Sequence, residues 1–315
     1  TSGSVNQPLL SGGLDELEKF DEPTLYVFPD AMAVSTASSY YSLINRALMQ
    51  SQKLKDRFVI IDAFANNSDN IRNTASLGNG VDLLKYGAAY HPFLRTVYSY
   101  ALAHNVTDET NTTSAGAYDT KALSELADSG DSDFNLILYN KIKTELEKQY
   151  VTLPPSSAMA GIYARVDSNR GVWKAPANES VSAAVEPTIK ITHEAQQDLN
   201  IHTSGKSINA IRSFTGKGIL VWGARTLAGN DNEWKYVPIR RFFNMVEESV
   251  EKATAQFVFE PNDANTWVKV RAMIENFLIL QWRAGALAGA KPEQAFYVRV
   301  GLGETMTADD ILNGI

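Results

Sequence analysis

The first third of the chain alternates short apolar runs with helical periodicity. Residues 24–28 form a β-prone apolar run closed by a Pro-Asp pair, which is typical of a buried strand before a turn. Residues 37–54 then place apolar side chains at helical spacing, and residues 57–62 supply a second apolar run. This order predicts a strand–helix–strand unit with a parallel strand pair. The patterning continues in two further runs, at 86–90 and 93–103.

The middle of the chain interrupts this pattern. Residues 105–133 are rich in Asn, Thr, Ser and Asp and poor in apolar side chains, which favours a surface insertion around one short helix. Residues 134–149 regain helical spacing before a Pro-Pro pair, which predicts a helix and its end. Residues 161–187 lack a clear period and are predicted to be a mostly irregular connector. We therefore expect a first domain over residues 1–155.

The second half of the chain predicts strands and long helices in sequence. Two β-prone runs within 208–224 are separated by a Thr-Gly pair, as in a hairpin. Two amphipathic helices are expected to begin near Pro238 and near Asp263, and an apolar run at 295–300 predicts a final strand. These elements suggest a second, α+β domain over 156–315. The fold class predicted for the whole chain is therefore α/β plus α+β in two domains.

Composition and charge exclude several classes of protein. With 315 residues and 44% hydrophobic side chains the chain can bury a core, and no apolar run approaches the roughly 18 residues of a membrane span. Twenty-nine basic against 36 acidic residues give a net charge of −7, so nucleic acid is not an expected partner. Zero cysteines exclude disulfides and thiolate metal sites. No basic stretch followed by an apolar run opens the sequence, so no signal peptide is expected.

One triplet, Gly205-Lys206-Ser207, is similar to the end of a phosphate-binding loop. The complete signature has another glycine five residues before the first one, and that position here is Asn200. Such a loop also follows a buried strand and opens a helix, whereas polar residues precede this triplet and a β-prone run follows it. The pattern favours a turn, and a nucleotide hydrolase built around Lys206 is the least favoured alternative.

Other catalytic arrangements are missing from the sequence. No two histidines have the four-residue spacing that directs both imidazoles at one metal ion on a helix. There is no Gly-x-Ser-x-Gly elbow, and the adjacent Glu247 and Glu248 splay apart on a helix. The sequence therefore predicts no catalytic residue, no cofactor and no metal ion, and hence no enzyme. The four scattered histidines are His91, His104, His193 and His202.

Tryptophan and arginine are instead concentrated in the second half. Both residue types anchor protein interfaces, because they combine a large contact area with directional polar groups. Buried tryptophans and solvated arginines are the simpler alternative for each residue alone. A chain with many such anchors and no catalytic motif favours protein binding. The residues are Trp222, Trp234, Trp267 and Trp282 with Arg212, Arg225, Arg240, Arg241, Arg271 and Arg283.

Several longer runs form a recognisable set. The run GKGILVWGARTL at 216–227 precedes WKYVPIRR at 234–241, and GVWKAPAN occupies 171–178. In the first half, DEPT occupies 21–24 and YGAAYHP occupies 86–92. Together these runs resemble contractile phage tail sheath proteins, in particular the sheaths of phage-like contractile injection systems. The signature positions are Trp173, Trp222, Gly223, Arg225, Trp234, Trp267 and Trp282.

The resemblance covers most of the chain and is weakest over 1–10 and 105–133. It implies a two-domain tail-sheath architecture, with an outer α/β domain and a C-terminal domain of sheet and helices. It also implies a structural subunit that polymerises around an inner tube and contracts to drive the tube through a target envelope. The implied partners are further copies of the chain, the tube protein, and baseplate and cap proteins. The resemblance places assembly in the bacterial cytoplasm, within a phage tail or a released phage-tail-like particle, with no membrane insertion by the sheath itself.

In sheath proteins, extended terminal arms add strands to the C-terminal domain of a neighbouring subunit. The present sequence stops before the usual closing β segment and opens without an obvious strand. We therefore expect both arm strands to be missing and the C-terminal domain to carry a bare sheet edge. A baseplate or cap component that reuses the C-terminal domain is the alternative function.

The resemblance also implies that helices of the C-terminal domain face the tube. Charged contacts suit a surface that slides, because they are screened by solvent and form again at low cost. Solvated charges without a partner are the simpler alternative. The tube-facing or inter-subunit candidates are Arg240, Arg241, Lys269, Arg271, Arg283 and Lys291.

Overall fold

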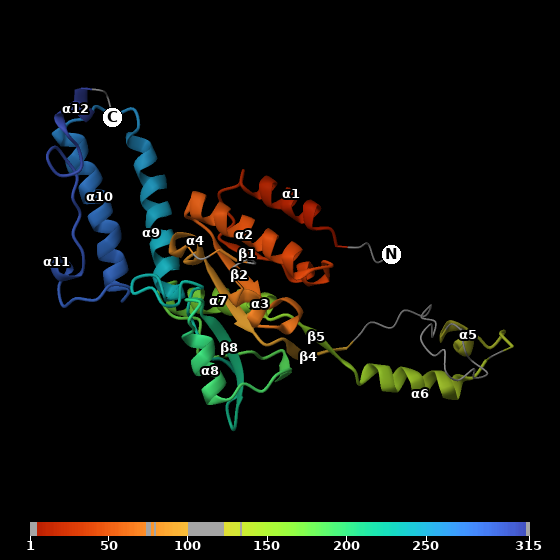
Figure 1. Cartoon of the computed structure of the whole chain (residues 1–315). Coiled ribbons are helices and arrows are strands. Elements are labelled where there is room, and N and C mark those ends of the chain that lie inside the picture. The colour runs from red at the N-terminus through yellow and green to blue at the C-terminus, as the bar shows by residue number, and fades with distance from the viewer. Residues whose placement is uncertain (1–4, 74–76, 79, 100–122, 133, 313–315) are drawn as a thin grey trace.

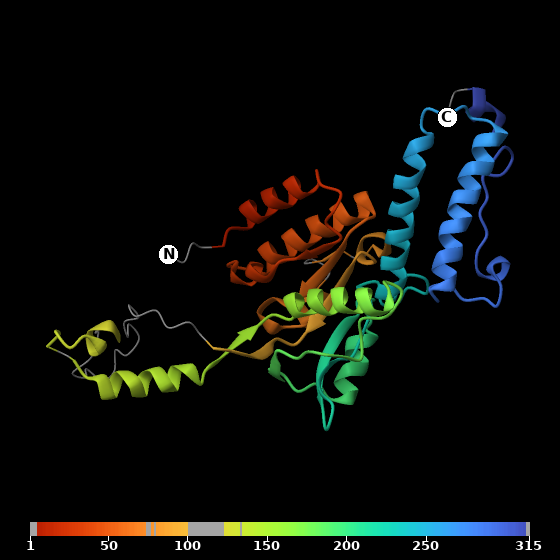
Figure 2. The ribbon, with the colours of Figure 1, turned by 180° about the vertical axis from the view of Figure 1, so that it is seen from behind.

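The computed structural model describes residues 5–73, 77–78, 80–99, 123–132 and 134–312. A central sheet with helices on both faces forms the body of the molecule (Figure 1). An extension with α5 (Leu123–Ala127) and α6 (Leu136–Glu147) leaves the body on one side. Two long helices, α9 (Val237–Thr254) and α10 (Ala264–Arg283), project on the other side (Figure 2). Most of the insertion expected at 105–133, together with His104, lies outside the described residues.

The central sheet has six strands in the order β1-β2-β3-β8-β9-β6. The first four are parallel, and the register places Leu25 beside Phe58 and Ile60 beside Ala88. Helix α2 (Ala37–Leu54) connects β1 to β2, so the predicted strand–helix–strand unit is confirmed. The strands are β1 (Leu25–Val27), β2 (Phe58–Asp62), β3 (Gly87–His91), β6 (Glu179–Ser180), β8 (Ile208–Phe214) and β9 (Gly218–Val221).

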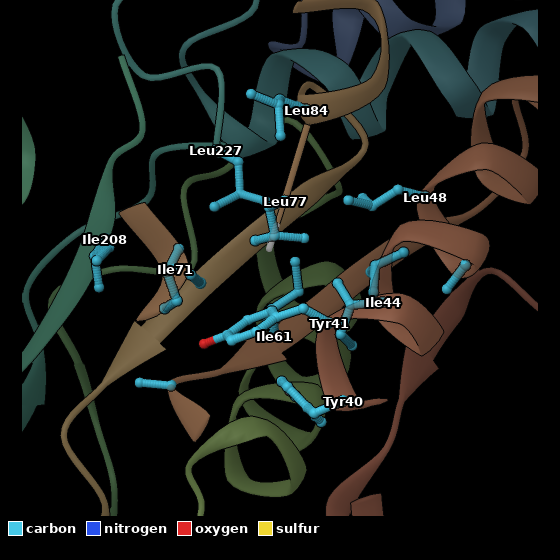
Figure 3. Close-up of a cluster of buried hydrophobic side chains, with 14 of the residues drawn as sticks. Tyr40, Tyr41, Ile44, Leu48, Ile61, Ile71, Leu77, Leu84, Ile208 and Leu227 are labelled. Carbon is cyan, nitrogen blue, oxygen red and sulfur yellow. The ribbon is translucent and has the colours of Figure 1, made fainter. Parts of the chain in front are cut away.

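Helix α2 covers one face of this sheet. It begins after Thr36, whose hydroxyl accepts a hydrogen bond from the Ser39 amide at 3.1 Å, and it ends at Lys55 in the left-handed conformation. Its apolar side chains meet those of the strands in one buried cluster (Figure 3). Helix α1 (Gln7–Leu17) packs on α2 and buries Leu14. The short elements on this side are η1 (Pro29–Ala33), η2 (Phe64–Asn66), α3 (Asp69–Arg72), α4 (Val81–Leu84) and α8 (His193–Asn200).

Helix α7 (Ser156–Arg170) packs on the second buried cluster of the body. It buries Met159, Ile162, Tyr163 and Val166, which are spaced as one face of a helix. The prediction of irregular structure from residue 161 is therefore wrong as far as residue 170. Small and polar residues fill the rest of the helix surface and hide its period, whereas the packing against the sheet supplies the stabilisation.

A second, three-stranded sheet forms the base of the lateral extension. It is antiparallel, in the order β5-β4-β7, and its strands are β4 (Leu94–Ser99), β5 (Tyr150–Leu153) and β7 (Ala184–Pro187). Helix α6 confirms the helix predicted over 134–149. It begins at Asn135, whose side chain accepts a hydrogen bond from the Leu138 amide at 3.0 Å.

The central sheet contains strands from both sides of the expected boundary at 155/156. Strands β1 to β3 precede that boundary, and β6, β8 and β9 follow it. The parallel pairing of β3 with β8 joins the two parts in one sheet, and the core cluster extends to Leu227 and Ala228. The two expected domains thus share one sheet body. The sequence did not predict this, because a pairing between strands so distant in sequence leaves no local signal.

The β8–β9 hairpin is confirmed, and its turn has positive φ angles of 75° at Gly216 and 76° at Gly218. Helices α9 and α10 begin where the sequence predicted them. The predicted final strand at 295–300 is wrong, since Ala295 ends α11 (Pro292–Ala295) and 296–300 pair with no described strand. A strand requires a partner for its backbone groups, and none of the described segments supplies one. The remaining elements are η3 (Ala255–Phe257) and α12 (Ala308–Leu312).

Candidate functional site

Lys206, the lysine of the Gly-Lys-Ser triplet, is completely buried. Its ammonium nitrogen donates hydrogen bonds to the carbonyl oxygens of Leu77 at 2.6 Å and Asn73 at 3.4 Å. Burial lowers the pKa of Lys206 from 10.5 to about 8. The triplet leads directly into β8 instead of a helix. Lys206 therefore ties the segment after α3 to the sheet, and its ammonium group faces carbonyls rather than an open phosphate cradle.

Titratable side chains do not gather into a metal site in the described ranges. Within them, no three His, Asp or Glu side chains lie close enough together to hold a metal ion. His91 is buried at the end of β3, and burial lowers its pKa to about 4. The same ranges contain no helix that is both long and apolar enough to cross a membrane.

Arg240, one of the candidates for tube contact, is buried at the start of α9, with 2% of its surface exposed. Its guanidinium donates to Asn244 Oδ1 at 2.7 Å and to Glu247 Oε1 at 2.7 Å. The same group lies over the Trp234 ring at 4.4 Å and the Tyr86 ring at 5.0 Å. Arg240 is thus occupied by partners within its own chain.

Arg241 is buried beside it and makes contacts with α7. Its two terminal nitrogens donate to the two carboxylate oxygens of Asp167, at 2.9 and 2.5 Å. The guanidinium also lies 4.7 Å from the centre of the Tyr163 ring. Such a bidentate pair fixes orientation as well as distance. Sequence reasoning missed Asp167, because it lies in the segment expected to be irregular; the spacing of the apolar residues of α7 was the signal that could have found it.

The other four candidate cations lie on the surface of the projecting helices. Lys269, Arg283 and Lys291 are exposed. Arg271 is partly exposed, and its guanidinium donates to the carbonyl oxygen of Val300 at 3.3 Å and lies 3.5 Å from the Glu304 carboxylate. Tube contact stays a prediction, and these four side chains are the ones available at the surface to make it.

The signature tryptophans pack at turns and helix ends. Trp173 meets Phe242 edge to face, and a Cβ on Gly171 would lie 2.4 Å from the Trp173 ring. The indole nitrogens of Trp267 and Trp282 donate to Asn262 Oδ1 at 2.5 Å and to the Gly289 carbonyl at 2.9 Å. These residues fix the backbone around the long helices.

Gly223 and Arg225 belong to the loop after β9 and are held by Asn209. The Asn209 amide donates to the carbonyls of Ala89 and Arg225, and its oxygen accepts from the Arg225 amide at 2.7 Å. A Cβ on Gly223 would lie 2.7 Å from the Asn209 side-chain oxygen, so only glycine fits there. Trp222 is partly exposed on the same loop and packs against Phe214. This part of the signature joins the loop to β3 and β8.

The surface of the projecting helices is apolar on several sides. We call residues 237–312 the helical arm; it comprises α9, η3, α10, α11 and α12. No residue of α10 is buried, although its sequence is rich in large apolar side chains. A groove of about 590 Å³ runs between α9, α10 and α11 and is lined by Phe242, Phe243, Val246 and Leu278 among others. The most exposed large apolar residues of the arm are Val258, Phe259, Val268, Leu280, Tyr297, Leu302 and Leu312.

The segment 296–300 lies in the arm without a strand partner. Its residues alternate between partly buried and exposed, beginning with Phe296 and Tyr297, as in a strand with one covered face. In the described residues its backbone forms no ladder of hydrogen bonds with another strand. Two of its backbone groups have other partners, since the Phe296 amide donates to the Pro292 carbonyl and the Val300 carbonyl accepts from Arg271.

Comparison with known protein families divides the chain in two. Residues 5–227 match the family described as phage tail sheath protein central domain, and residues 229–310 match the phage tail sheath C-terminal domain. The division falls in the loop between the sheet body and the helical arm. Together the two matches include nearly all of the described residues.

Individual relatives agree with these matches. The tail sheath protein of Burkholderia phage BcepMu is 29% identical over 148 residues, which cover 44% of this chain and 30% of that protein. The helical sheath of the anti-feeding prophage in its contracted state is 30% identical, with a TM-score of 0.69 over 100% of this chain and 70% of that one. A chain in the baseplate of the same particle is 28% identical, with a TM-score of 0.71 over 100% of this chain and 68% of that one. The chain thus matches less than a third of the curated phage relative and about two thirds of the solved sheath chain.

Proposed function

Because this chain belongs to the phage tail sheath protein family, we propose that it is a structural subunit of a contractile sheath, which polymerises around an inner tube and contracts to drive it through a target envelope. It acts by exchanging contacts between copies of itself and catalyses no reaction. Its further partners are the inner tube protein and the baseplate and cap proteins of the particle. It assembles in the bacterial cytoplasm and forms part of a phage tail or a released phage-tail-like particle.

The exposed apolar helical arm is the observation that supports this proposal most strongly. A helix that is apolar on several sides is stable only when other chain segments cover it, and no described residue of α10 is buried. Large exposed apolar patches on soluble proteins mark interfaces. Further copies of the same chain, arranged as in the helical sheath of the anti-feeding prophage, would cover this surface.

The segment 296–300 supports strand exchange between subunits. An extended terminal arm from a neighbouring copy would pair with the backbone between Tyr297 and Arg299, for which no hydrogen bond to another described strand is formed. This chain spans 70% of the length of the solved sheath chain.

Electron microscopy of the protein produced together with its tube protein tests the proposal. We expect long regular tubules around the tube, in extended or contracted form. Val298→Pro removes a backbone donor from the segment 296–300 and should abolish or shorten the tubules. Val298→Ala, which keeps this donor, is the control. Single subunits beside intact tubes, with no sheath around them, would contradict the function.

A further inference from the structure

The buried attachment of the helical arm to the sheet body lies in the first two turns of α9; farther along, Lys252 makes an exposed ion pair with Asp21 at 3.6 Å. All the buried residues of α9 lie between Val237 and Asn244, and α10 has none. Two consecutive arginines, Arg240 and Arg241, occupy this short buried stretch. Arginine has a good helix propensity on a solvent-exposed face, so the formation of α9 does not require these two side chains to be buried. Their burial therefore concerns the junction between the arm and the body.

Arg241 attaches one side of α9 to α7. Its bidentate pair with Asp167 and its position over the Tyr163 ring contact two residues of the same helix. Asp167 is 23% exposed and Arg241 8%, so solvent has limited access to the pair. Because a bidentate pair has a defined plane, this contact opposes rotation of α9 about its own axis.

Arg240 and Asn244 attach another side of α9 to different elements. Arg240 lies between the Tyr86 and Trp234 rings, next to the start of β3. Its guanidinium holds the Asn244 side chain, whose amide donates to the Arg57 carbonyl at 3.1 Å, at the start of β2. Consecutive helix residues point about 100° apart, so the two arginines face different sides of the helix. Contacts on two sides oppose tilting, which a contact on one side does not.

We propose that Arg240, Arg241, Asn244 and Asp167, here called the arm joint, hold the helical arm rigidly on the sheet body. Apolar packing alone is not directional and permits neighbouring surfaces to slide, whereas these hydrogen bonds fix an angle. In a contracting sheath, a rotation imposed on the arm by its contacts then turns the outer body by the same angle. This mechanical role rests on the function proposed above; the rigidity of the joint does not.

Distance measurements on the isolated chain test the rigidity. The chain has no cysteine, so cysteines placed at exposed Met49 on α2 and exposed Asn265 on α10 are the only sites for spin labels. We expect one narrow distance distribution in this background. Arg241→Met and Asp167→Asn should each broaden it about twofold, because the arm then samples several angles. Arg95→Met, which removes an exposed arginine–carboxylate pair away from the joint, is the matched control and should leave it unchanged.

Hydrogen exchange of the unmodified chain keeps the test valid if a variant fails to fold. Amides of residues 241–247 should exchange at least about tenfold more slowly than those of 250–254 in the same helix, since only the former belong to the joint. Equal exchange along α9, or an unchanged distance distribution in folded Arg241→Met and Asp167→Asn, would overturn the proposal.

Assembled particles separate this inference from the proposed function. If the wild-type chain forms no sheath, the proposed function fails while the distance measurement still decides the rigidity of the joint. If the wild-type sheath contracts and Asp167→Asn subunits, shown to be loose in isolation, contract to the same rotation per subunit, the mechanical role of the joint is refuted. A smaller or irregular rotation in that variant is the expected result.

Discussion

At the residue scale, charged side chains inside the body fasten one element to another. Arg57 at the start of β2 is 1% exposed and donates to the carbonyl oxygens of Leu17 and Phe20 and to the Tyr26 hydroxyl. It thereby bonds the carbonyl of Leu17, the last residue of α1, and that of Phe20 in the turn that follows. Lys206 does the same for the segment after α3. Neither role was predicted, because a basic residue in a sequence is normally expected at the surface.

Asp62 is the buried carboxyl of the body. It is 1% exposed at the end of β2, and its Oδ1 accepts a hydrogen bond from the Ser156 amide at 2.8 Å, at the first residue of α7. Burial raises the pKa of Asp62 from 3.8 to about 7, and the hydrogen bond from Ser156 opposes this shift only in part. Between about pH 4 and pH 7 the folded state thus binds more protons than the unfolded state. The contribution of Asp62 to stability therefore falls as the pH rises through this window.

Asp62→Asn tests this effect, since asparagine can accept the same hydrogen bond without a charge. We expect the variant to match the wild-type chain at pH 4 and to exceed its free energy of unfolding by about 1–3 kcal/mol at pH 8. Urea unfolding followed by circular dichroism at both values measures the difference. A variant that is less stable than the wild-type chain at pH 8 would show that the ionised carboxylate stabilises the fold.

At the scale of single elements, periodicity located most helices and strands, and the exceptions have definite causes. Helix α2 and the β8–β9 hairpin follow their sequence patterns closely, because each buries one regular face. Helix α7 ends at Gly171, where φ is 97° and the backbone passes against the Trp173 ring. The GVWKAPAN run thus serves as a helix stop that also positions a tryptophan against α9.

Gly171→Ala should destabilise the protein by about 2–3 kcal/mol, because the new methyl group meets the indole and the positive φ is strained. Gly161→Ala, in the exposed middle of the same helix with no atom within 4 Å of the added carbon, is the matched control. It should stabilise by about 0.5–1 kcal/mol. Thermal or urea unfolding of both variants measures the contrast. Equal effects of the two substitutions would show that the turn at Gly171 is adaptable.

At the scale of the whole molecule, the sheet body and the helical arm differ in how they are stabilised. The body has two buried clusters, whereas α10, the longest helix described, has no buried residue. The two family matches divide between these parts, before and after residue 228. Most of the buried apolar side chains therefore lie in the body, and under the proposed function the arm is the part that contacts other chains.

Contact of the arm with the tube should depend on salt. If Lys269 and Arg283 face the tube, changing each to Gln should weaken sheath–tube binding about two- to fivefold at low salt, as expected for exposed charge pairs. The difference should disappear in high salt. Co-sedimentation of sheath with purified tube measures it, with Lys217→Gln at the exposed tip of the β8–β9 hairpin as the control. An equal loss in the control would refute a specific role of the two arm residues.

The amino-acid sequence by itself determined the kind of most elements, the family resemblance and the positions of the signature residues. These depend on local spacing and on motifs such as WGARTL, which can be recognised without a structure. The sequence also suggested Arg240 and Arg241 as tube-facing or inter-subunit candidates. It could not show that both are buried, because the burial of a charged side chain depends on what packs around it.

Only the tertiary structure decided which strands share a sheet and which charges are internal. The pairing of β3 with β8, and of Arg241 with Asp167, joins residues that are distant in sequence. Such contacts form through the closure of long loops and the exclusion of water, and neither leaves a local period in the chain. For the same reason, the unpaired segment 296–300 carried a strand pattern in the sequence, but only the fold showed that its partner is not among the described residues.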